Sequence, residues 1–280
     1  MQIIRTVADL RAWSRSLRRE NKTLGLVPTM GALHEGHLSL VRAAKTSCDA
    51  VAVSIFVNPT QFGPNEDFAL YPRTFDADCS LLIAEGVDVV FAPAPDEIYR
   101  SGAATFVEVE GLSNRLDGAS RPGHFRGVAT VVAKLFIAAE PDRVFFGQKD
   151  AAQIAVLRRM VADLDLPVEL VVCAIMRESD GLAMSSRNRY LSSDERQRAL
   201  VLRRSLQDVE SRIAAGERSS AALVAAAQSV FASTAEVRID YIAAVDWATL
   251  QPIETARPGT LFAVAAWVGK TRLIDNFIVQ

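Results

Sequence analysis

The sequence is poor in several residue types, and each shortage excludes a class of protein. Its 280 residues include three cysteines and three histidines, and only 7% are aromatic. Cys48, Cys79 and Cys173 are widely spaced and form no CxxC pair, so reduced thiols are expected rather than a disulfide framework. Because aromatic residues are few and small aliphatic ones abundant, the composition favours an α/β protein over an aromatic-rich β-sandwich.

The chain also lacks an excess of either charge and lacks long apolar runs. It has 31 basic and 33 acidic residues, a net charge of −2, and a pI of about 6.0. This balance argues against non-specific nucleic-acid binding. No apolar run reaches the ~18 residues of a membrane span, and Arg5 and Asp9 stand where a signal peptide needs an apolar core. We therefore expect a cytoplasmic protein that contacts neither membranes nor nucleic acid.

Short apolar runs alternate with helical patterns in the first part of the chain. Residues 49–57 form a near-continuous β-branched run, which is typical of a strand covered on both faces. Further strands are expected at 24–27, 87–91, 143–147 and 168–175, with weak alternation at 106–109, and helices at 38–45, 75–85, 126–139 and 151–164. This βαβα order predicts an α/β fold with a mostly parallel, doubly wound sheet. A polar loop is expected at 58–65.

The pattern changes near Arg177, and we place a domain boundary between Arg177 and Ser186. Ser192 and Glu195 form a capping-box pattern for a helix that extends to about Ala214. A second helix is expected at 221–232, with strands at 238–245 and 261–268. Residues 1–177 are thus expected to bind the ligands, and residues 178–280 to form a smaller α+β domain.

Two histidines, His34 and His37, stand in the segment 28–37, PTMGALHEGH. The segment lies between an expected strand and an expected helix and contains a glycine turn, so a helix N-terminus with unpaired N–H groups could face an anion. Two imidazoles beside it favour a phosphate that undergoes chemistry, and His37 could donate to an oxygen that gains charge.

Two other interpretations of the histidine pair remain open. The spacing is not that of the zinc pattern HExxH, but a metal site made of His34, His37 and His124 is compatible with the sequence. The pair could also be purely structural, as helix-capping or core histidines.

Several polar segments follow expected strands, where a parallel sheet binds its ligands. Asn58 and Gln61 could fix a small polar substrate without adding charge. Lys149 could neutralise the charge of phosphate oxygens, and Asp150 could accept hydrogen bonds from ribose hydroxyls or help to bind Mg²⁺. Ser185, Ser186 and Arg187 could form a mobile clamp over a triphosphate, and the loop 117–127 could flank the site. Taken alone, each segment is a weak signal that an ordinary turn also explains, and for residues 147–150 the ordinary turn is favoured until the context is added.

Taken together, these segments resemble the pantothenate synthetase family. PTMGALHEGH matches that family's form of the HIGH motif, and MSSRN at 184–188 matches its counterpart of KMSKS. Both motifs occur in looser form in class I aminoacyl-tRNA synthetases and other nucleotidyltransferases. VSIFVNPTQF, YPRT, RPGHFRG, PDRVFFG and RLIDN also match, in order, and the matches extend from about residue 24 to residue 276.

The resemblance implies a Rossmann-like fold, a C-terminal lid domain at 178–280 and a homodimer formed through the larger domain. It also implies a two-step ligation that uses ATP and Mg²⁺. The carboxylate of (R)-pantoate attacks the α-phosphorus of ATP, and the amine of β-alanine then attacks the resulting pantoyl adenylate, which releases AMP. Adenylation supplies the leaving group that a carboxylate lacks, and positioning and charge neutralisation should supply most of the rate.

The resemblance further implies roles for individual residues. His37, His34 and Lys149 are the implied catalytic residues, and Asp78 is the implied Mg²⁺ ligand. Pantoate is implied to contact Gln61, Gln153, Asn58 and Met30. The implied ATP contacts are Met30, Gly31, Ala32, Leu33, His34, Glu35, Gly36, His37, Gly147, Gln148, Lys149, Asp150, Met176, Met184, Ser185, Ser186 and Arg187.

Two positions depart from the family pattern. Asp117 and Gln148 each stand where a glutamate is common, which bears on fine positioning rather than on the reaction. Two other functions remain possible from sequence: an adenylyltransferase that releases a dinucleotide-like product, and a nucleotide-sensing module without turnover. A tRNA ligase is disfavoured, because the chain shows no anticodon-binding domain and no basic face.

Overall fold

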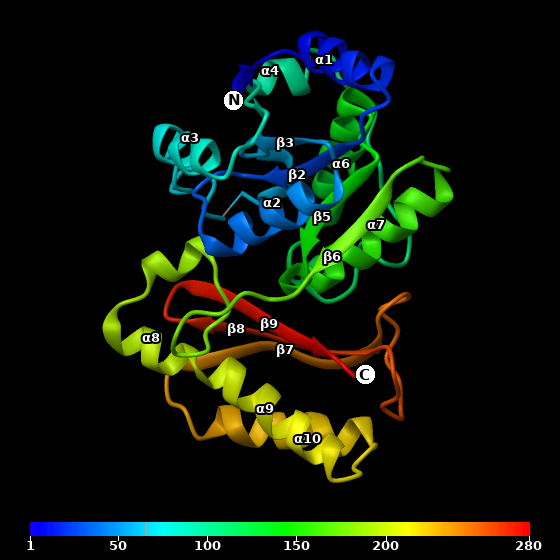
Figure 1. Ribbon diagram of the computed structural model, residues 1–280. Helices are drawn as coiled ribbons and strands as arrows, with labels where there is room; N and C mark the ends of the chain where they lie inside the picture. The colour runs from blue at the N-terminus through cyan, green and yellow to red at the C-terminus, as the bar shows by residue number, and fades with distance from the viewer. Residues whose placement is uncertain (65) are drawn as a thin grey trace. The chain divides into compact units, whose positions relative to one another are not determined.

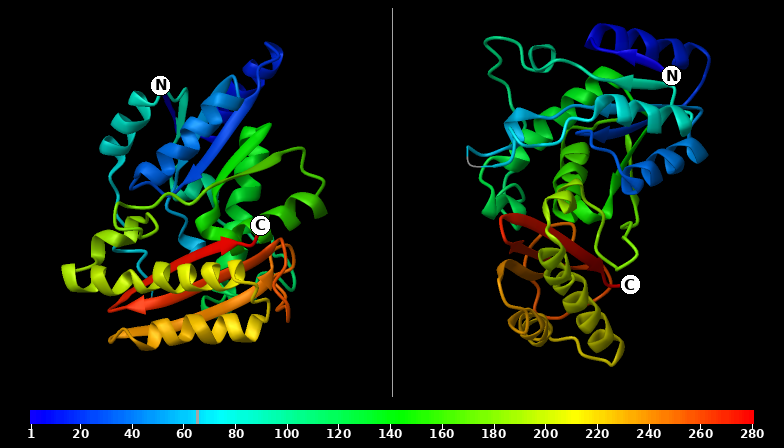
Figure 2. Two further views of the ribbon diagram at one scale, coloured as in Figure 1. Left: turned by 60° about the horizontal axis from the view of Figure 1, so that its bottom comes forward. Right: turned by 90° about the vertical axis from the view of Figure 1, so that its left-hand side faces the viewer.

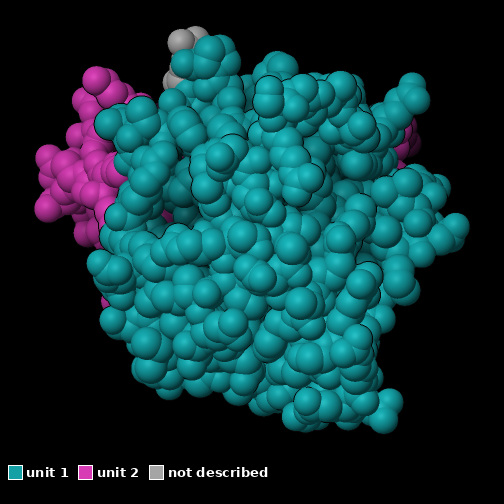
Figure 3. All heavy atoms as spheres, turned by 90° about the horizontal axis from the view of Figure 1, so that it is seen from above, with its two compact units in different colours: residues 1–147, 156–173 teal, residues 148–155, 174–280 magenta. Residues whose placement is uncertain are grey.

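A computed structural model describes residues 1–64 and 66–280. These residues divide into two compact units, which Figure 3 draws in different colours. Unit 1 comprises residues 1–147 and 156–173, and unit 2 comprises residues 148–155 and 174–280. The chain therefore leaves unit 1 for eight residues after Gly147 before it returns.

Unit 1 is built on a six-stranded sheet in the order β1-β4-β3-β2-β5-β6, and every adjacent pair is parallel (Figure 1). The strands are β1 (Gln2–Ile4), β2 (Leu24–Thr29), β3 (Ala50–Ile55), β4 (Val89–Phe91), β5 (Arg143–Gly147) and β6 (Glu169–Cys173). The predicted parallel, doubly wound α/β sheet is confirmed. β1 was not predicted, because three residues are too few to show a period, and residues 106–109 form no strand.

Four helices of unit 1 fall in segments where helices were expected, whereas those at 7–19, 95–98 and 117–120 were not predicted. The helices are α1 (Val7–Arg19), α2 (Glu35–Ser47), α3 (Phe75–Ala84), α4 (Pro95–Ile98), α5 (Asp117–Ser120), α6 (His124–Ala139) and α7 (Ala151–Asp163), the last of which begins in unit 2. Right-handed connections place α2 and α3 on one face of the sheet and α1, α6 and α7 on the other. One buried cluster joins Leu38 and Val41 of α2 and Leu82 of α3 to Val53 and Phe145 of the sheet.

The strand order reverses beside β2, since β3 and β4 lie to one side of it and β5 and β6 to the other. A crevice for ligands forms beyond the carboxyl ends of the strands at such a switch point. The segment that follows β2 contains the paired histidines, and the short helix η1 (Pro59–Gln61) follows β3. The predicted loop at 58–65 therefore contains a helical turn, and its last residue, Asn65, lies outside the described residues.

Unit 2 is built on an antiparallel sheet, β7-β8-β9. β7 (Val237–Asp246), β8 (Thr260–Val268) and β9 (Thr271–Ile278) lie side by side, with α9 (Val201–Ala214) and α10 (Ser220–Ala232) on one face (Figures 1 and 2). The unit also contains η2 (Gln148–Asp150), η3 (Ser186–Tyr190) and α8 (Ser193–Ala199). The capping box of Ser192 and Glu195 is confirmed, but the helix it opens is interrupted at Leu200, which separates α8 from α9.

Within the described residues, no helix is both long enough and apolar enough to cross a lipid bilayer. The three cysteines carry free thiols, and burial raises the pKa of all three thiols above the ordinary value.

Candidate active site

The turn between β2 and α2 places His34 and His37 against each other. Gly31 has a φ of +82°, and a Cβ there would stand 3.1 Å from Asp78 Oδ2 and from Ile55 Cγ2. Glycine is therefore required by both the backbone conformation and the space. The chain then extends at His34, which is the N-cap of α2, and the two imidazole centroids lie 4.1 Å apart.

Both imidazoles cap the helix through the same ring nitrogen. His34 Nδ1 accepts the backbone N–H of Gly36 at 3.1 Å, and His37 Nδ1 accepts the backbone N–H of His34 at 3.4 Å. A nitrogen that accepts cannot carry the proton, so in the neutral ring the proton is assigned to Nε2. Each imidazole thus has a fixed tautomer with its donor at the outer ring nitrogen.

This arrangement changes the sequence-based expectation of an open helix N-terminus. The N–H of Gly36 is taken by an imidazole, and the N–H of His37 donates to His34 O at 2.8 Å. The capping hypothesis and the catalytic hypothesis for the histidine pair are therefore compatible, because capping through Nδ1 defines the donor at Nε2. An anion would meet these ring edges rather than a row of unpaired backbone groups.

Asp78 of α3 holds the turn that precedes the histidines. It is 2% exposed, and its carboxylate accepts the N–H of Ala32 at 3.0 Å and that of Leu33 at 2.8 Å. The hydroxyl of Thr74 donates to both oxygens at 3.2 Å. Three donors thus engage both carboxylate oxygens, the single Thr74 hydrogen being shared between them, and the structure favours a supporting role for Asp78 over the magnesium-binding role that the resemblance implied.

A second cluster gathers Met30, Asn58 and Gln61, three of the four residues expected at the pantoate site. Gln61 accepts from Asn58 Nδ2 at 3.1 Å through Oε1, and its Nε2 lies 2.9 Å from Met30 Sδ. The backbones approach closely here, because a Cβ at Gly127 of α6 would stand 2.3 Å from Thr60 O. The structure thus brings Met30 and Gln61 together as expected.

Asn58 itself is buried and fully hydrogen-bonded. It is 1% exposed, its Nδ2 also donates to Gly127 O at 3.1 Å, and its Oδ1 accepts from Thr60 Oγ1 at 2.9 Å and from Tyr99 Oη at 2.8 Å. These contacts favour an indirect role, in which Asn58 fixes the amide of Gln61. Tyr99 was missed by the sequence analysis, since it lies 41 residues from Asn58 in a segment without a recognisable motif.

The loop at 121–127 supports the same cluster. His124 Nδ1 lies 2.8 Å from Gln61 O, and its Nε2 lies 3.1 Å from Arg121 Nη1. Because a guanidinium only donates, Nε2 accepts and Nδ1 carries the proton towards Gln61 O. Burial, together with the Arg121 charge, lowers the pKa of His124 to about 4, so the ring is neutral near pH 7.

The charge of Arg121 is balanced by Glu66. The Arg121 Nε lies 2.8 Å from Glu66 Oε1. Burial alone would raise the pKa of Glu66, but the guanidinium holds it below its ordinary value. The loop therefore serves to position Gln61. Asp117, one of the two departures, is buried at the start of α5.

The metal hypothesis finds no support in this arrangement. Within residues 1–64 and 66–280, no group of three or more His, Cys, Asp or Glu side chains could hold a metal ion. His34 and His37 use Nδ1 for capping, and His124 contacts Arg121 and Gln61 instead.

The remaining expected ATP contacts, apart from Gly147, belong to unit 2. Lys149 and Asp150 lie in η2, and Gln153, expected at the pantoate site, lies in the first turn of α7. Ser185 is the N-cap of η3, where its Oγ accepts the N–H of Arg187 at 3.3 Å. Met184 N donates to Met176 O at 2.9 Å. The expected site residues are therefore divided between the two units, with both histidines in unit 1 and Lys149 in unit 2.

Comparison with known proteins shows the family of the chain. The family model for pantoate-beta-alanine ligase matches residues 2–278. Pantothenate synthetase from Acidobacterium capsulatum is 62% identical over 290 residues, which cover 100% of this chain and 97% of that protein. Pantothenate synthetase from Moorella thermoacetica is 52% identical over 280 residues, which cover 100% of this chain and 99% of that protein.

Solved structures give the same result. Pantothenate synthetase from Thermus thermophilus superposes with a TM-score of 0.94 at 46% identity, covering 99% of both chains. The pantoate-beta-alanine ligase from Francisella tularensis, complexed with beta-gamma ATP and beta-alanine, gives a TM-score of 0.81 at 34% identity and covers 99% of this chain and 97% of its own. With a family model that spans nearly the whole sequence and relatives above 50% identity, the chain belongs to the pantoate-beta-alanine ligase family and is a ligase.

Proposed function

We propose that the protein joins (R)-pantoate and β-alanine to form pantothenate, using ATP and passing through pantoyl adenylate. A pantoate carboxylate oxygen attacks the α-phosphorus, the bond from that phosphorus to the bridging oxygen breaks, and pyrophosphate leaves. The β-alanine nitrogen then attacks the pantoyl carbonyl carbon, the bond to the AMP oxygen breaks, and the amine loses a proton. The Francisella relative, complexed with beta-gamma ATP and beta-alanine, supports this choice of substrates.

The observation that carries the proposal is the fixed tautomer of the histidine pair. With each Nδ1 accepting a backbone N–H, His34 and His37 present Nε2–H donors. Such donors stabilise charge that develops on phosphate oxygens during transfer without reorganising at that moment. His37 stabilises the transferred group in this proposal, His34 donates a hydrogen bond to the phosphates, and Lys149 and Arg187 neutralise their charge.

The pantoate site in this proposal is centred on Gln61, with Met30 beside it and Gln153 of unit 2 as a second amide. The Gln61 Oε1 is held by Asn58 and one Nε2 hydrogen is directed to Met30 Sδ, so in this proposal the second Nε2 hydrogen donates to a substrate oxygen. Mg²⁺ enters with the triphosphate in this proposal, where it neutralises phosphate charge. We assign it no ligand from Asp78, because the hydrogen bonds described above occupy that carboxylate.

An assay that omits pantoate, ATP and β-alanine in turn tests the reaction. We expect AMP release to require all three substrates. With pantoate alone, ATP labelled at the bridging oxygen should scramble its label, because adenylate formation is reversible. AMP release without β-alanine at the full rate, or no scrambling with pantoate, would exclude the adenylate route. A single elution volume at twice the chain mass would support the expected homodimer.

Replacement of Gln61 tests the pantoate site. We expect Gln61→Ala to raise the KM for pantoate roughly 10- to 100-fold, because a donor to the substrate is lost, while the KM for ATP changes little. Gln207→Ala, the same substitution at an exposed position of α9, is the matched control. Equal increases in both KM values would contradict the assignment.

A further inference from the structure

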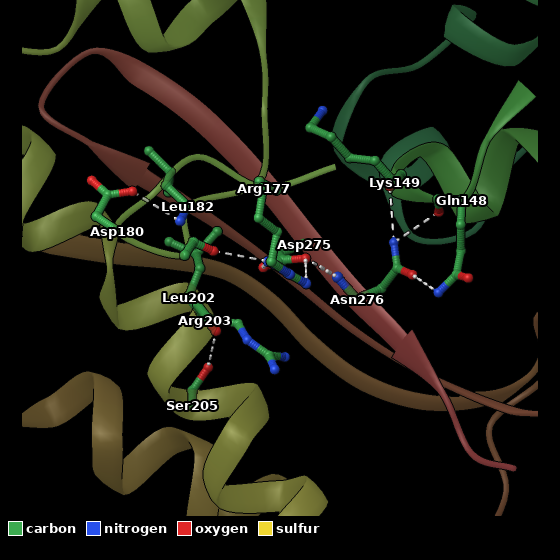
Figure 4. Close-up of polar contacts among 12 residues, drawn as sticks. Gln148, Lys149, Arg177, Asp180, Leu182, Leu202, Arg203, Ser205, Asp275 and Asn276 are labelled. Atoms are coloured by element: carbon green, nitrogen blue, oxygen red, sulfur yellow. Dashed lines mark hydrogen bonds and ion pairs between the residues drawn. The ribbon is translucent and has the colours of Figure 1, made fainter. Parts of the chain in front are cut away.

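Strand β9 presents two consecutive polar side chains, Asp275 and Asn276, whose function the proposed reaction leaves unexplained. Neighbouring side chains of a strand point to opposite faces of the sheet. Leu273 and Phe277 pack in the cluster beneath α9 and α10, so Asp275 lies on that helix-covered face and Asn276 on the other. Both are buried, at 2% and 3% exposure. Figure 4 shows their contacts extending in opposite directions from the strand.

Asn276 holds the turn that contains Lys149. Its Nδ2 donates to Gln148 O at 3.1 Å and to Lys149 O at 2.9 Å, and its Oδ1 accepts from Gln148 Nε2 at 3.2 Å. The amide cannot be reversed, because its oxygen would then face two carbonyl oxygens. Asn276 is thus hydrogen-bonded to the backbone of η2, and the Lys149 side chain extends away from Asn276 (Figure 4).

Asp275 holds the segment that leads to the serine and arginine clamp. It pairs with both Arg177 terminal nitrogens, at 2.7 and 3.0 Å, and Arg177 also donates to Gly181 O at 3.1 Å. A bridge between Arg177 and Ala183 closes this segment into a hairpin, and Ser185 lies two residues after Ala183.

The hairpin is in turn bonded to η3. Asn188 Nδ2 donates to Glu178 Oε1 at 2.6 Å and to Ala183 O at 3.1 Å. Strand β9 also contacts both η2 and η3 directly. The Lys149 turn and the clamp are thus both attached to one strand, at neighbouring residues.

We propose that Asp275 and Asn276 are positioning residues for the triphosphate, which set the placement of Lys149 relative to Ser185–Arg187. The inference rests on the proposed function, in which these groups bind ATP. Neither residue touches substrate in this account. Asn276 acts through the backbone of Lys149, and Asp275 acts through Arg177 and the hairpin.

Asn276→Ala tests the proposal most directly. The variant leaves the carbonyls of Gln148 and Lys149 without the donor that holds them, and we expect the KM for ATP to rise roughly 10- to 100-fold, with a matching loss of ATP affinity in calorimetry. The KM for pantoate should stay unchanged. A purely structural defect would lower the active fraction, and therefore kcat, without changing the KM for ATP.

Two further variants keep the test decisive if Asn276→Ala does not fold. Asn276→Ser retains a hydroxyl that can donate to one carbonyl and should give an intermediate KM for ATP. Asp275→Asn keeps the shape but removes the charge that pairs with Arg177, and should raise the same constant. The matched control is Asp240→Asn in β7, because Asp240 pairs with Arg272 of β9 at 2.7 Å and contacts neither η2 nor the hairpin through that pair.

The outcomes separate this inference from the proposed function. An unchanged KM for ATP in Asn276→Ala or in Asn276→Ser would overturn the positioning role, and so would an equal rise in Asp240→Asn. Lys149→Ala is measured alongside. If Lys149→Ala leaves the KM for ATP and kcat unchanged, the role given to Lys149 in the proposed function is wrong. If only Lys149→Ala changes them, the proposed function stands and the positioning role fails.

Discussion

Two of the turns that carry proposed ATP contacts follow strands of the same parallel sheet but are held in different ways. The histidine turn after β2 is fixed mainly by near neighbours, since the imidazoles of His34 and His37 accept the backbone N–H groups of Gly36 and His34, and Asp78 adds support from a distant segment. The Lys149 turn after β5 is fixed by Asn276, which lies 127 residues further along the chain.

The difference shows that a motif's place after a strand does not decide to which part of the molecule it belongs. The histidine turn is part of unit 1, whereas the residues after Gly147 are part of unit 2. In the proposed reaction, the histidines are therefore positioned by the parallel sheet of unit 1, whereas Lys149 is positioned by strand β9 of unit 2.

The largest expected effect tests whether capping and catalysis are separate properties of His37. We expect His37→Ala to lower the rate of adenylate formation by about two to four orders of magnitude, because it removes the Nε2–H donor. It also removes the cap on His34 N, which should lower the free energy of unfolding by about 1 kcal/mol. Single-turnover kinetics and urea unfolding measure the two effects.

His37→Gln is the control that sharpens this test. Glutamine at the third position of a helix accepts the N-cap N–H in an ordinary capping box, so the stability should recover while the rate stays low. A rate near that of the parent in either variant would show that His37 serves only to hold the turn.

The second test concerns the distant support of the histidine turn. Asp78→Asn places an amide donor against the backbone N–H of Ala32 or Leu33, and we expect the free energy of unfolding to fall by about 2–3 kcal/mol. The exposed Asp76→Asn in the same helix should cost almost nothing. The Mg²⁺ concentration needed for half-maximal activity should not change, and a large increase in it would restore the metal-binding role of Asp78.

A smaller effect is expected from His124, which supports Gln61 in unit 1. Its pKa is lowered to about 4 in the folded protein, against ~6.5 in an unfolded chain. Between these values the unfolded chain binds more protons, so stability is lost as the pH falls through that window. The free energy of unfolding should be about 2 kcal/mol lower at pH 5 than at pH 7.5 from this group alone.

Urea unfolding of the parent and of His124→Gln at both pH values checks this. The variant cannot titrate at this position, so its stability should depend less on pH, whatever its stability at pH 7.5. Equal pH dependence in both proteins would mean that the buried ring is protonated without cost.

The contrast between the two turns also explains what the sequence could and could not predict. The parallel sheet followed from the spacing of apolar runs, and the histidine turn from one continuous segment, because their determinants are close in sequence. The roles of Asn58 and Asp78 did not follow, since an amide or carboxylate in a motif looks the same whether it faces a ligand or a backbone N–H.

Long-range contacts were the least predictable part of the site. Tyr99 and Asn276 contact site segments that lie far from them in the sequence, and no local period or spacing marks them. The RLIDN segment contributed to the family resemblance, but its chemistry became interpretable only when β9 was seen to face Gln148 and Lys149.

The smallest expected effect returns to Gln148, which the family resemblance marked as a departure. In Gln148→Glu the donor to Asn276 Oδ1 is lost, while the two bonds from Asn276 to the carbonyls of η2 remain. Because those two bonds hold the backbone, we expect the KM for ATP to rise only about two- to fivefold. A rise as large as that in Asn276→Ala would show that the hydrogen bond between the Gln148 and Asn276 side chains, rather than the bonds from Asn276 to the backbone carbonyls, holds the Lys149 turn. An unchanged KM for ATP would show that the two hydrogen bonds to the carbonyls are enough to attach the Lys149 turn to β9.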